Sequence, residues 1–349
     1  MFNGGGLHCM SVNNKKILDG NQVGVNQIIG AKYQYPLDLY KKGVENNWNP
    51  REVIMGQDSL DWKSKVTDDE KLIIKRALGF FSAGESLVNN NIYLSEYRYV
   101  TDGACRQYMV RKGQEEAIHN ETVAVCVETF GLTQEEVAEA YINVPSVKNK
   151  TDFLIKNTSD LLEDKNFNIK TIEGKQEFVK NLFCFYILCE GTFFWSNFIM
   201  LLSICKRGVL NGLKSQILYS LRDEGNHLSF GTWLINEIKN DYPEIWTAEF
   251  KKLLNSLMVE AVDLEIQYSK DALPNPMLGM NSDMFVQLMQ YIGNIRQKSI
   301  GLESTFKASS NPFSWVEEVM EAPVMTAFFE ARERNYRAAS ALDGDLDEF

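Results

Sequence analysis

The amino-acid sequence predicts an all-α protein, a helical bundle built around a metal site of carboxylates and imidazoles. Apolar residues recur at helical spacing along most of the 349 residues, and no alternating run predicts a strand. The motif Glu-x-x-His occurs twice, as Glu116–His119 and Glu224–His227, and uses two of the three histidines. Residues three apart lie on one helix face, so each motif pairs a carboxylate with an imidazole. Bundles that bind two iron or manganese ions add one carboxylate from each of two further helices.

The first helix that can supply such a carboxylate is predicted for residues 68–99. It begins with three acidic residues, whose charges suit the positive end of a helix dipole. Glu85 lies within its apolar stripe, where a charge is rare unless it is paired or bound to metal. The chain before this helix is predicted to form a loosely ordered arm over residues 1–30 and then a short aromatic segment ending at Trp48. Glu85 is therefore the first candidate ligand.

The second carboxylate comes from the most apolar stretch of the chain, residues 182–205. By length and composition this helix could cross a membrane, but a helix that is apolar all round also suits the centre of a large bundle. Its one charged residue is Glu190, and polar Ser196 and Asn197 follow, which favours the bundle and predicts no membrane association. Glu190 is therefore the second candidate, with Phe198 among the aromatic residues on its face.

The other elements are also predicted to be helical. The helix over residues 102–130 carries the first motif and ends at Gly131, a common helix terminator, and the helix over 211–240 carries the second. Proline-containing breaks separate the later segments. The remaining predictions are a short helix at 133–141, mixed loop and helix at 144–170, helices at 244–268, 282–302 and 311–331, and a polar tail at 332–349.

Together these helices offer four carboxylates and two imidazoles. Such a set balances two divalent ions, and oxygen donors with one nitrogen per ion suit iron or manganese. The predicted ligands are Glu85, Glu116, His119, Glu190, Glu224 and His227. Asp223 precedes a ligand and is predicted to orient a ligating imidazole, although its position also fits a surface acid.

Composition limits the other functions that the chain could have. A formal net charge of −11 argues against nucleic-acid binding, which requires a basic face. The six cysteines include no Cys-x-x-Cys pair and lie mostly in apolar helical stretches, so we expect reduced, buried thiols in a cytoplasmic protein. The first ten residues lack the charged and apolar regions of a signal peptide.

In this order, the motifs resemble the small, radical-generating subunit of class I ribonucleotide reductase, from residue 33 to the end of the chain. Ferritin-type proteins share the metal ligands alone. The resemblance is carried by Trp48-Asn49-Pro50-Arg51-Glu52-Val53, Gly79-Phe80-Phe81 before Glu85, Glu116-x-x-His119, Glu190, Arg222-Asp223-Glu224-x-x-His227 and Tyr336 in an acidic tail.

The resemblance implies a ferritin-like bundle over residues 31–331, a homodimer and an oxygen-activated dimetal centre. It implies that an oxidising equivalent passes to the large subunit, which reduces ribonucleotides. Trp48, Asp223 and His119 would form the relay from the metals, and Tyr336 would continue it in the tail. Residues 332–349 would form a flexible tail, disordered alone, whose final residues bind the large subunit.

One position departs from the family pattern. Most members carry a tyrosine four residues after the first ligand histidine, where it is oxidised to a stable radical, but this chain has Val123. Glu85 stands where many relatives have aspartate. The combination resembles class Ic, in which a manganese–iron pair holds the oxidising equivalent, while two irons or two manganese ions remain alternatives. Phe194 and Phe198 are expected to keep the pocket at Val123 dry.

Two other classes of protein share this bundle. Ligand-binding oxidases have no reason to keep a tail with Tyr336, and an iron-storage protein needs neither the tail nor Trp48. Both features are present in this chain, which favours the reductase subunit.

Overall fold

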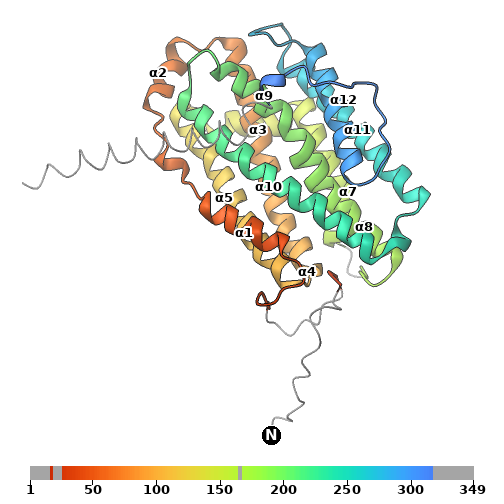
Figure 1. Ribbon diagram of the computed structural model, residues 1–349. Helices are drawn as coiled ribbons and strands as arrows, with labels where there is room; N and C mark the ends of the chain where they lie inside the picture. The colour runs from red at the N-terminus through yellow and green to blue at the C-terminus, as the bar shows by residue number, and fades with distance from the viewer. Residues whose placement is uncertain (1–15, 19–25, 164–166, 317–349) are drawn as a thin grey trace, which may run out of the picture. The chain divides into compact units, whose positions relative to one another are not determined.

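The computed structural model describes residues 16–18, 26–163 and 167–316, and every regular element named within them is a helix (Figure 1). An isolated bridge between Met277 and Met280 is the β pairing found in these ranges. The prediction of an all-α, ferritin-like bundle is confirmed. The chain divides into two units, residues 1–308 and 309–349, and the elements described below belong to the first.

The helices follow one another with short connections. In chain order they are α1 (Tyr35–Glu45), the 3-10 turn η2 (Pro50–Glu52), α2 (Gly56–Ser64), α3 (Asp68–Asn91), the π-helical turn η3 (Ile92–Glu96), α4 (Tyr97–Tyr99), α5 (Gly103–Phe130), α6 (Gln134–Asn143), α7 (Pro145–Glu163), α8 (Ile172–Leu182), the π-helical segment η4 (Phe183–Phe193), α9 (Phe194–Cys205), α10 (Asn211–Asp241), the 3-10 turn η5 (Pro243–Ile245), α11 (Ala248–Ala272) and α12 (Ser282–Ser299).

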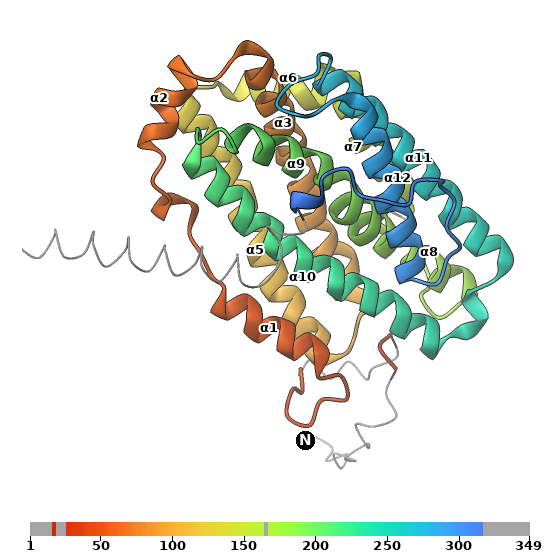
Figure 2. The same cartoon turned by 45° about the horizontal axis from the view of Figure 1, so that its top comes forward.

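Four long helices form the centre of the first unit: α3, α5, α10, and the continuous helix made of α8, η4 and α9. Helix α3 packs against α5, and η4 packs against α10. Helix α1 lies along α5 and α10 on one side, while α7, α11 and α12 cover η4 on the other (Figure 2). The two central pairs therefore present their inner faces to one another.

Local sequence signals place the ends of the helices that carry the motifs. Thr67 and Glu70 form a reciprocal capping box at the start of α3, which confirms the predicted beginning of that helix. The carboxylate of Asp102 caps α5 by accepting from two backbone N–H groups. Gly131 ends α5 with a positive φ of 66°, a conformation that glycine adopts without steric cost.

The apolar helix is longer than predicted and is buried within the protein. It begins at Ile172, after the Thr171 side chain caps it, and continues to Cys205. This is the one described helix that is long and apolar enough to cross a membrane, and 94% of its apolar window is buried inside the protein. Such burial is the pattern of a core helix in a bundle.

The segment predicted as mixed loop and helix, residues 144–170, contains both: residues 167–170 are not helical, and the 19 residues before the undescribed positions form helix α7. Its buried face includes Val147, Leu154 and Thr158 at helical spacing, but Lys150 lies on that same face. A lysine in the stripe breaks the apolar pattern, because lysine is almost never fully buried unless it is paired. Here the Lys150 ammonium lies 2.7 Å from the carboxylate of Glu265.

The described part of the N-terminal arm includes residues 16–18, which contact the end of α10. The backbone N–H of Ile17 donates to the Asp241 carboxylate at 3.0 Å, and the Ile17 side chain is buried. Other predictions fall outside the described residues: most of the arm 1–30, most of the helix 311–331, the tail 332–349 and Tyr336.

Candidate metal centre

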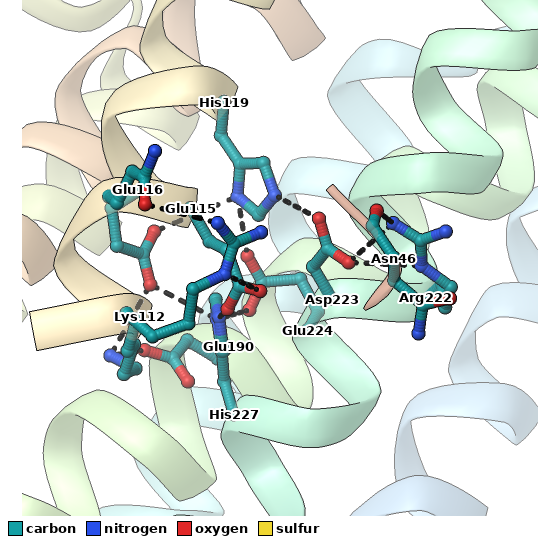
Figure 3. Close-up of polar contacts among 12 residues, drawn as sticks. Asn46, Lys112, Glu115, Glu116, His119, Glu190, Arg222, Asp223, Glu224 and His227 are labelled. Carbon is teal, nitrogen blue, oxygen red and sulfur yellow. Dashed lines mark hydrogen bonds and ion pairs between the residues drawn. The ribbon is translucent and has the colours of Figure 1, made fainter. Parts of the chain in front are cut away.

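Six buried side chains from four helical segments converge in the middle of the bundle, and all of them except Glu85 are labelled in Figure 3. They are the six ligands that the motifs predict: Glu85 from α3, Glu116 and His119 from α5, Glu190 from η4, and Glu224 and His227 from α10. None is more than 2% exposed, so any charge among them requires compensation. The two Glu-x-x-His motifs therefore face one another across the bundle, as the sequence predicts.

The six residues form two overlapping groups whose donor atoms all lie within 4.8 Å of one another. Both groups contain Glu116 and Glu224, so two carboxylates are available to bridge neighbouring ions. The groups, called here the His119 half and the His227 half, are Glu85, Glu116, His119 and Glu224, and Glu116, Glu190, Glu224 and His227. A pair of divalent ions that share two bridging carboxylates fits this arrangement.

The hydrogen bonding of the donor atoms supports the same interpretation. Several buried donor atoms have no hydrogen-bond partner among the described residues: Glu85 Oε2, both carboxylate oxygens of Glu116, both ring nitrogens of His119, Glu190 Oε2 and Glu224 Oε1. An unsatisfied buried polar atom costs about 1–3 kcal/mol. Metal coordination would satisfy these atoms except His119 Nε2, which faces Asp223, so the residues present fit a dimetal centre.

The charges of the centre shift the pKa of both imidazoles. Burial alone would lower each pKa, but the surrounding carboxylates outweigh it and hold the pKa of His119 and His227 well above the usual value. Burial also raises the pKa of Glu85 well above its usual value. The carboxylates that raise the imidazole pKa values are the same negative charges that two divalent ions would balance.

Each imidazole turns one nitrogen towards the centre and the other towards a supporting carboxylate. His119 Nδ1 lies 3.1 Å from Glu224 Oε1, while its Nε2 lies 3.5 Å from Asp223 Oδ2. His227 Nδ1 lies 3.1 Å from Glu116 Oε1, while its Nε2 lies 2.9 Å from Glu115 Oε2. A carboxylate on the outer nitrogen fixes the ring orientation and raises ligand basicity. The centre thus has two such supports, of which the sequence analysis identified Asp223.

An arginine holds each supporting carboxylate in place. Arg222 donates to Asp223 Oδ1 at 2.9 Å and to the backbone carbonyl of Asn46 at 2.7 Å. Arg111 donates to Glu115 Oε1 at 2.9 Å and, through Nη1, to the Asn47 side chain at 2.8 Å. Both arginines therefore connect the outer carboxylates to the loop that leads to Trp48.

The link between the centre and Trp48 passes through Asp223. The buried indole Nε1 of Trp48 donates to Asp223 Oδ2 at 2.8 Å, the same oxygen that faces His119. The Trp48 ring also packs at 5.0 Å from the Tyr219 ring. After Trp48, Arg51 forms ion pairs with Glu121 and Glu128, which attach the loop to α5. His119, Asp223 and Trp48 thus lie in one line of contacts.

Comparison with known proteins agrees with this geometry. The family model described as "Ribonucleotide reductase, small chain" matches residues 25–312. The ribonucleoside-diphosphate reductase subunit beta of Chlamydia pneumoniae is 42% identical over 339 residues, which cover 97% of each chain. This chain belongs to the ribonucleotide reductase small-chain family. It is accordingly an oxidoreductase subunit, that of a ribonucleoside-diphosphate reductase.

More distant members of the family and solved structures extend the comparison. The small chain of Schizosaccharomyces pombe is 27% identical over 90% of this chain and 75% of its own. The ribonucleotide reductase R2 subunit from Clostridium botulinum has the same fold with a TM-score of 0.79 at 22% identity, covering 87% of this chain and 93% of its own. An R2-like ligand-binding oxidase with a reconstituted Mn/Fe cofactor reaches 0.64 at 22% identity, over 80% and 99%.

Val123 of this small chain lies one helical turn beyond His119 and separates two spaces. Towards the interior it lines a cavity of about 10 Å³ together with Glu85, His119 and Phe198. A cavity of that size holds at most one water molecule. Towards the outside Val123, which is 7% exposed, lines a surface hollow of about 610 Å³. The pocket beside the ligands is nearly filled.

The expected aromatic wall of that pocket is formed differently from the prediction. Phe198 lines the interior cavity, and so does Phe81. Phe194 is not among the lining residues, and it packs behind them with ring centroids 5.3 Å from Phe81 and 6.1 Å from Phe198. The reason is helical geometry, because Phe194 and Phe198 lie one turn apart and Phe81 of α3 fills the space between Phe194 and the cavity.

Lys112 is a second residue of the centre, besides Glu115, that the sequence analysis did not identify. Its ammonium is fully buried and lies 2.7 Å from Glu190 Oε1 and 3.3 Å from Glu116 Oε1 (Figure 3). Burial lowers the pKa of Lys112, but the negative charges of Glu190, Glu116 and Glu96 raise it by more. The net pKa therefore lies above its usual value. Burial also raises the pKa of the partner carboxylate, Glu190, to about 8. The short contacts of the Lys112 ammonium with Glu190 and Glu116 favour its charged form.

The signals that could have identified the two missed residues are specific. An acidic residue precedes both motifs, Glu115 before Glu116 and Asp223 before Glu224, and that repetition marks Glu115. Lys112 lies four residues before Glu116, a spacing that usually indicates a solvent-exposed ion pair. The burial of that pair depends on the η4 segment, whose π-helical turn carries Glu190 against α5. π-helical turns are frequent at functional sites.

Proposed function

We propose that this small chain initiates ribonucleotide reduction with an oxidising equivalent stored on manganese and iron, as in class Ic, rather than on a tyrosine. The observation that carries the proposal is Val123 beside an intact set of ligands. An aliphatic side chain provides no group that can be oxidised to a stable radical. The nearly filled cavity beside it holds at most one water molecule.

The six predicted ligands would hold the metal pair. Glu85 and His119 would belong to one ion, Glu190 and His227 to the other, and Glu116 and Glu224 would bridge them. When bound and activated by oxygen, the pair supplies the stored oxidising equivalent. Asp223 and Glu115 would orient the two imidazoles, since each carboxylate faces the outer nitrogen of its ring.

Three residues would carry the equivalent towards the large subunit. His119, Asp223 and Trp48 form a continuous line, with contacts of 3.5 Å and 2.8 Å between successive side chains. Indole is an oxidisable group, and the Asp223 carboxylate beside its N–H is positioned to accept a proton as the ring loses an electron. Tyr336, outside the described residues, would receive the equivalent next.

The proposed partners follow from membership of the family. The functional unit would be a homodimer that works in the cytoplasm with the large subunit, and residues 332–349 would bind that subunit. Deletion of residues 342–349 is expected to abolish reduction of ribonucleotides by the mixed subunits while the bound metal per chain stays the same. Unchanged turnover after the deletion would refute this role of the tail.

Two kinds of alternative remain. Two iron or two manganese ions in this subunit would occupy the same ligands, so the metal-loading experiment distinguishes them. Other functions of the same bundle are less well supported by these contacts. A ligand-binding oxidase or a metal-storage protein would not require the hydrogen bond between Trp48 and Asp223, which is buried and leads away from the centre. That link favours export of an oxidising equivalent.

The test is to load metal-free protein with manganese and iron together, with iron alone and with manganese alone. Each sample is mixed with the large subunit, and deoxyribonucleotide formation is measured beside the metal content. The mixed metals are expected to give the highest turnover per dimetal centre. Full turnover with iron alone, accompanied by an organic radical signal, would show that another side chain has replaced the tyrosine.

A further inference from the structure

Among the described lysines and arginines, Lys112 is the one whose side chain forms ion pairs with the candidate ligands themselves. It projects from α5 one turn before Glu116, and its ammonium touches one carboxylate oxygen each of Glu116 and Glu190. The Tyr186 ring lies 4.5 Å from the same ammonium and closes the space beside it. Nothing in this surrounding is exposed to solvent, so the ammonium is held in place by these three side chains.

The contact with Lys112 gives the two oxygens of the Glu190 carboxylate different roles. Oε1 accepts a hydrogen bond from the Lys112 ammonium at 2.7 Å. Oε2 is buried and has no hydrogen-bond partner. One oxygen is thus fixed by the protein, and the other is left as the donor atom for a metal.

The His119 half has no equivalent cation. Among the described residues, Glu85 forms its ion pair with His119 Nδ1 at 3.5 Å, and no lysine or arginine nitrogen lies within 4 Å of its carboxylate. The two arginines close to the centre do not supply an equivalent positive charge to the ligands of the His119 half. Arg222 pairs with Asp223 and Arg111 with Glu115, so each of these positive charges is matched by an outer carboxylate.

One further carboxylate lies near Lys112, on a different element. Glu96 belongs to the π-helical turn η3, and it accepts hydrogen bonds from the Tyr186 hydroxyl at 2.5 Å and from Asn91 at 2.9 Å. Tyr186 therefore lies between Glu96 and Lys112, contacting both. Burial raises the pKa of Glu96, while the Lys112 ammonium and the hydrogen bonds from Tyr186 and Asn91 oppose that shift.

We propose that Lys112 is a positioning residue that makes the two halves of the centre unequal. It presents Glu190 to the metal through one oxygen and places a positive charge in direct contact with ligands of the His227 half. That half consequently binds its divalent ion more weakly than the His119 half does. The inference rests on the proposed function, because it requires that the six residues bind two metals.

The expected effect is large because both charges lie in the interior. A unit charge a few ångströms from a divalent ion, screened as in a protein, changes binding by at least about tenfold. In metal-free wild-type protein, the first equivalent of Mn²⁺ should therefore fill one half and give the spectrum of isolated ions. The second equivalent should then produce exchange-coupled pairs.

The experiment follows Mn²⁺ binding by electron paramagnetic resonance, without oxidant and without the large subunit. Lys112→Met removes the charge and the hydrogen bond, whereas Lys112→Gln retains a donor to Glu190 without the charge. In both variants we expect the two affinities to approach one another by about tenfold or more. Coupled pairs should then appear well below one equivalent. Persistence of the wild-type stepwise pattern in both variants would overturn the proposal.

A matched control separates this effect from the general cost of removing a buried lysine. Lys150 is also fully buried and pairs with one carboxylate, Glu265, at 2.7 Å, away from the candidate ligands. Lys150→Met should keep the stepwise pattern, and an equal change in this variant would count against a specific role of Lys112. Absence of Mn²⁺ binding to the wild-type protein would instead refute the dimetal centre itself.

Discussion

The two halves of the centre are alike in their ligands and differ in what surrounds them. Each half has an imidazole supported by a carboxylate, and each of those carboxylates is held by an arginine. On the His119 side the support continues to Trp48 through a hydrogen bond of 2.8 Å. On the His227 side a buried lysine contacts the ligands directly. The difference suggests that the His119 half is connected to the route for the oxidising equivalent, while in the His227 half a positive charge modifies metal binding.

The largest effect should come from breaking the link that only the His119 side possesses. Trp48→Phe replaces the oxidisable indole and deletes the hydrogen bond to Asp223, so turnover with the large subunit should fall to near zero. Metal content per chain should stay at the wild-type value, because Trp48 is not a candidate ligand. Trp62→Phe is the control, since Trp62 is also buried and stacks on Phe130 at 4.5 Å. Wild-type turnover in the Trp48 variant would contradict the assigned route.

The second test compares the two imidazole supports. Glu115→Gln should weaken metal binding by about 10–100-fold, because loss of an outer carboxylate has that effect in other metal sites. Asp223→Asn should cause a similar loss and also impair turnover after the metals are restored at high concentration. Metal titration followed by turnover at saturating metal distinguishes the two. Equal behaviour of both variants at saturation would show that the route to Trp48 does not depend on Asp223.

Much of this comparison could be predicted from the sequence, and the rest depended on packing between distant elements. The two motifs, Glu85 and Glu190 follow from helical spacing and from charges within apolar stretches. Lys112 could not be predicted in the same way, because its partner Glu190 is 78 residues further along the chain. Their contact depends on how the π-helical segment and α5 are placed relative to one another in the bundle.

A similar limit applies to burial along a single helix. The extent of helix α7 within residues 144–170 was not predicted, because Lys150 interrupts its apolar stripe and the pairing of Lys150 with Glu265 on α11 depends on how the two helices pack. The wall of the Val123 pocket was partly misassigned for the same reason. The spacing of Phe194 and Phe198 places both on one side of a helix, but Phe81 from α3 occupies the inner position.

Val123 provides a smaller test on the His119 side. Val123→Tyr introduces a phenol beside a cavity of about 10 Å³, and overpacking of this kind costs about 1–3 kcal/mol. We expect a lower midpoint of thermal unfolding and no gain in turnover, whereas Val123→Ile should change both much less. Higher turnover of the tyrosine variant, together with a tyrosyl radical signal, would indicate that the valine is not needed for this chemistry.

The smallest expected effect is the pH dependence of metal binding, to which the histidines of both halves should contribute. The pKa of His119 and His227 is raised in the metal-free protein, so both rings carry protons at neutral pH that a metal must displace. Metal binding should therefore release protons and strengthen as pH rises. The raised pKa values also stabilise the metal-free fold below pH 6.5, and this contribution is lost as pH rises through the folded pKa values. Calorimetry in buffers of different ionisation enthalpy measures the release, and a value of zero would contradict the assigned protonation.

The central claim is that the oxidising equivalent resides on the metals beside Val123. The most direct measurement is a titration of the active, manganese- and iron-loaded protein with a one-electron reductant, followed by paramagnetic resonance and by turnover with the large subunit. The account predicts that one electron per dimetal centre abolishes activity, that the spectrum of the metals changes in proportion, and that no organic radical is present before reduction. An organic radical whose signal decreases in parallel with activity would contradict it.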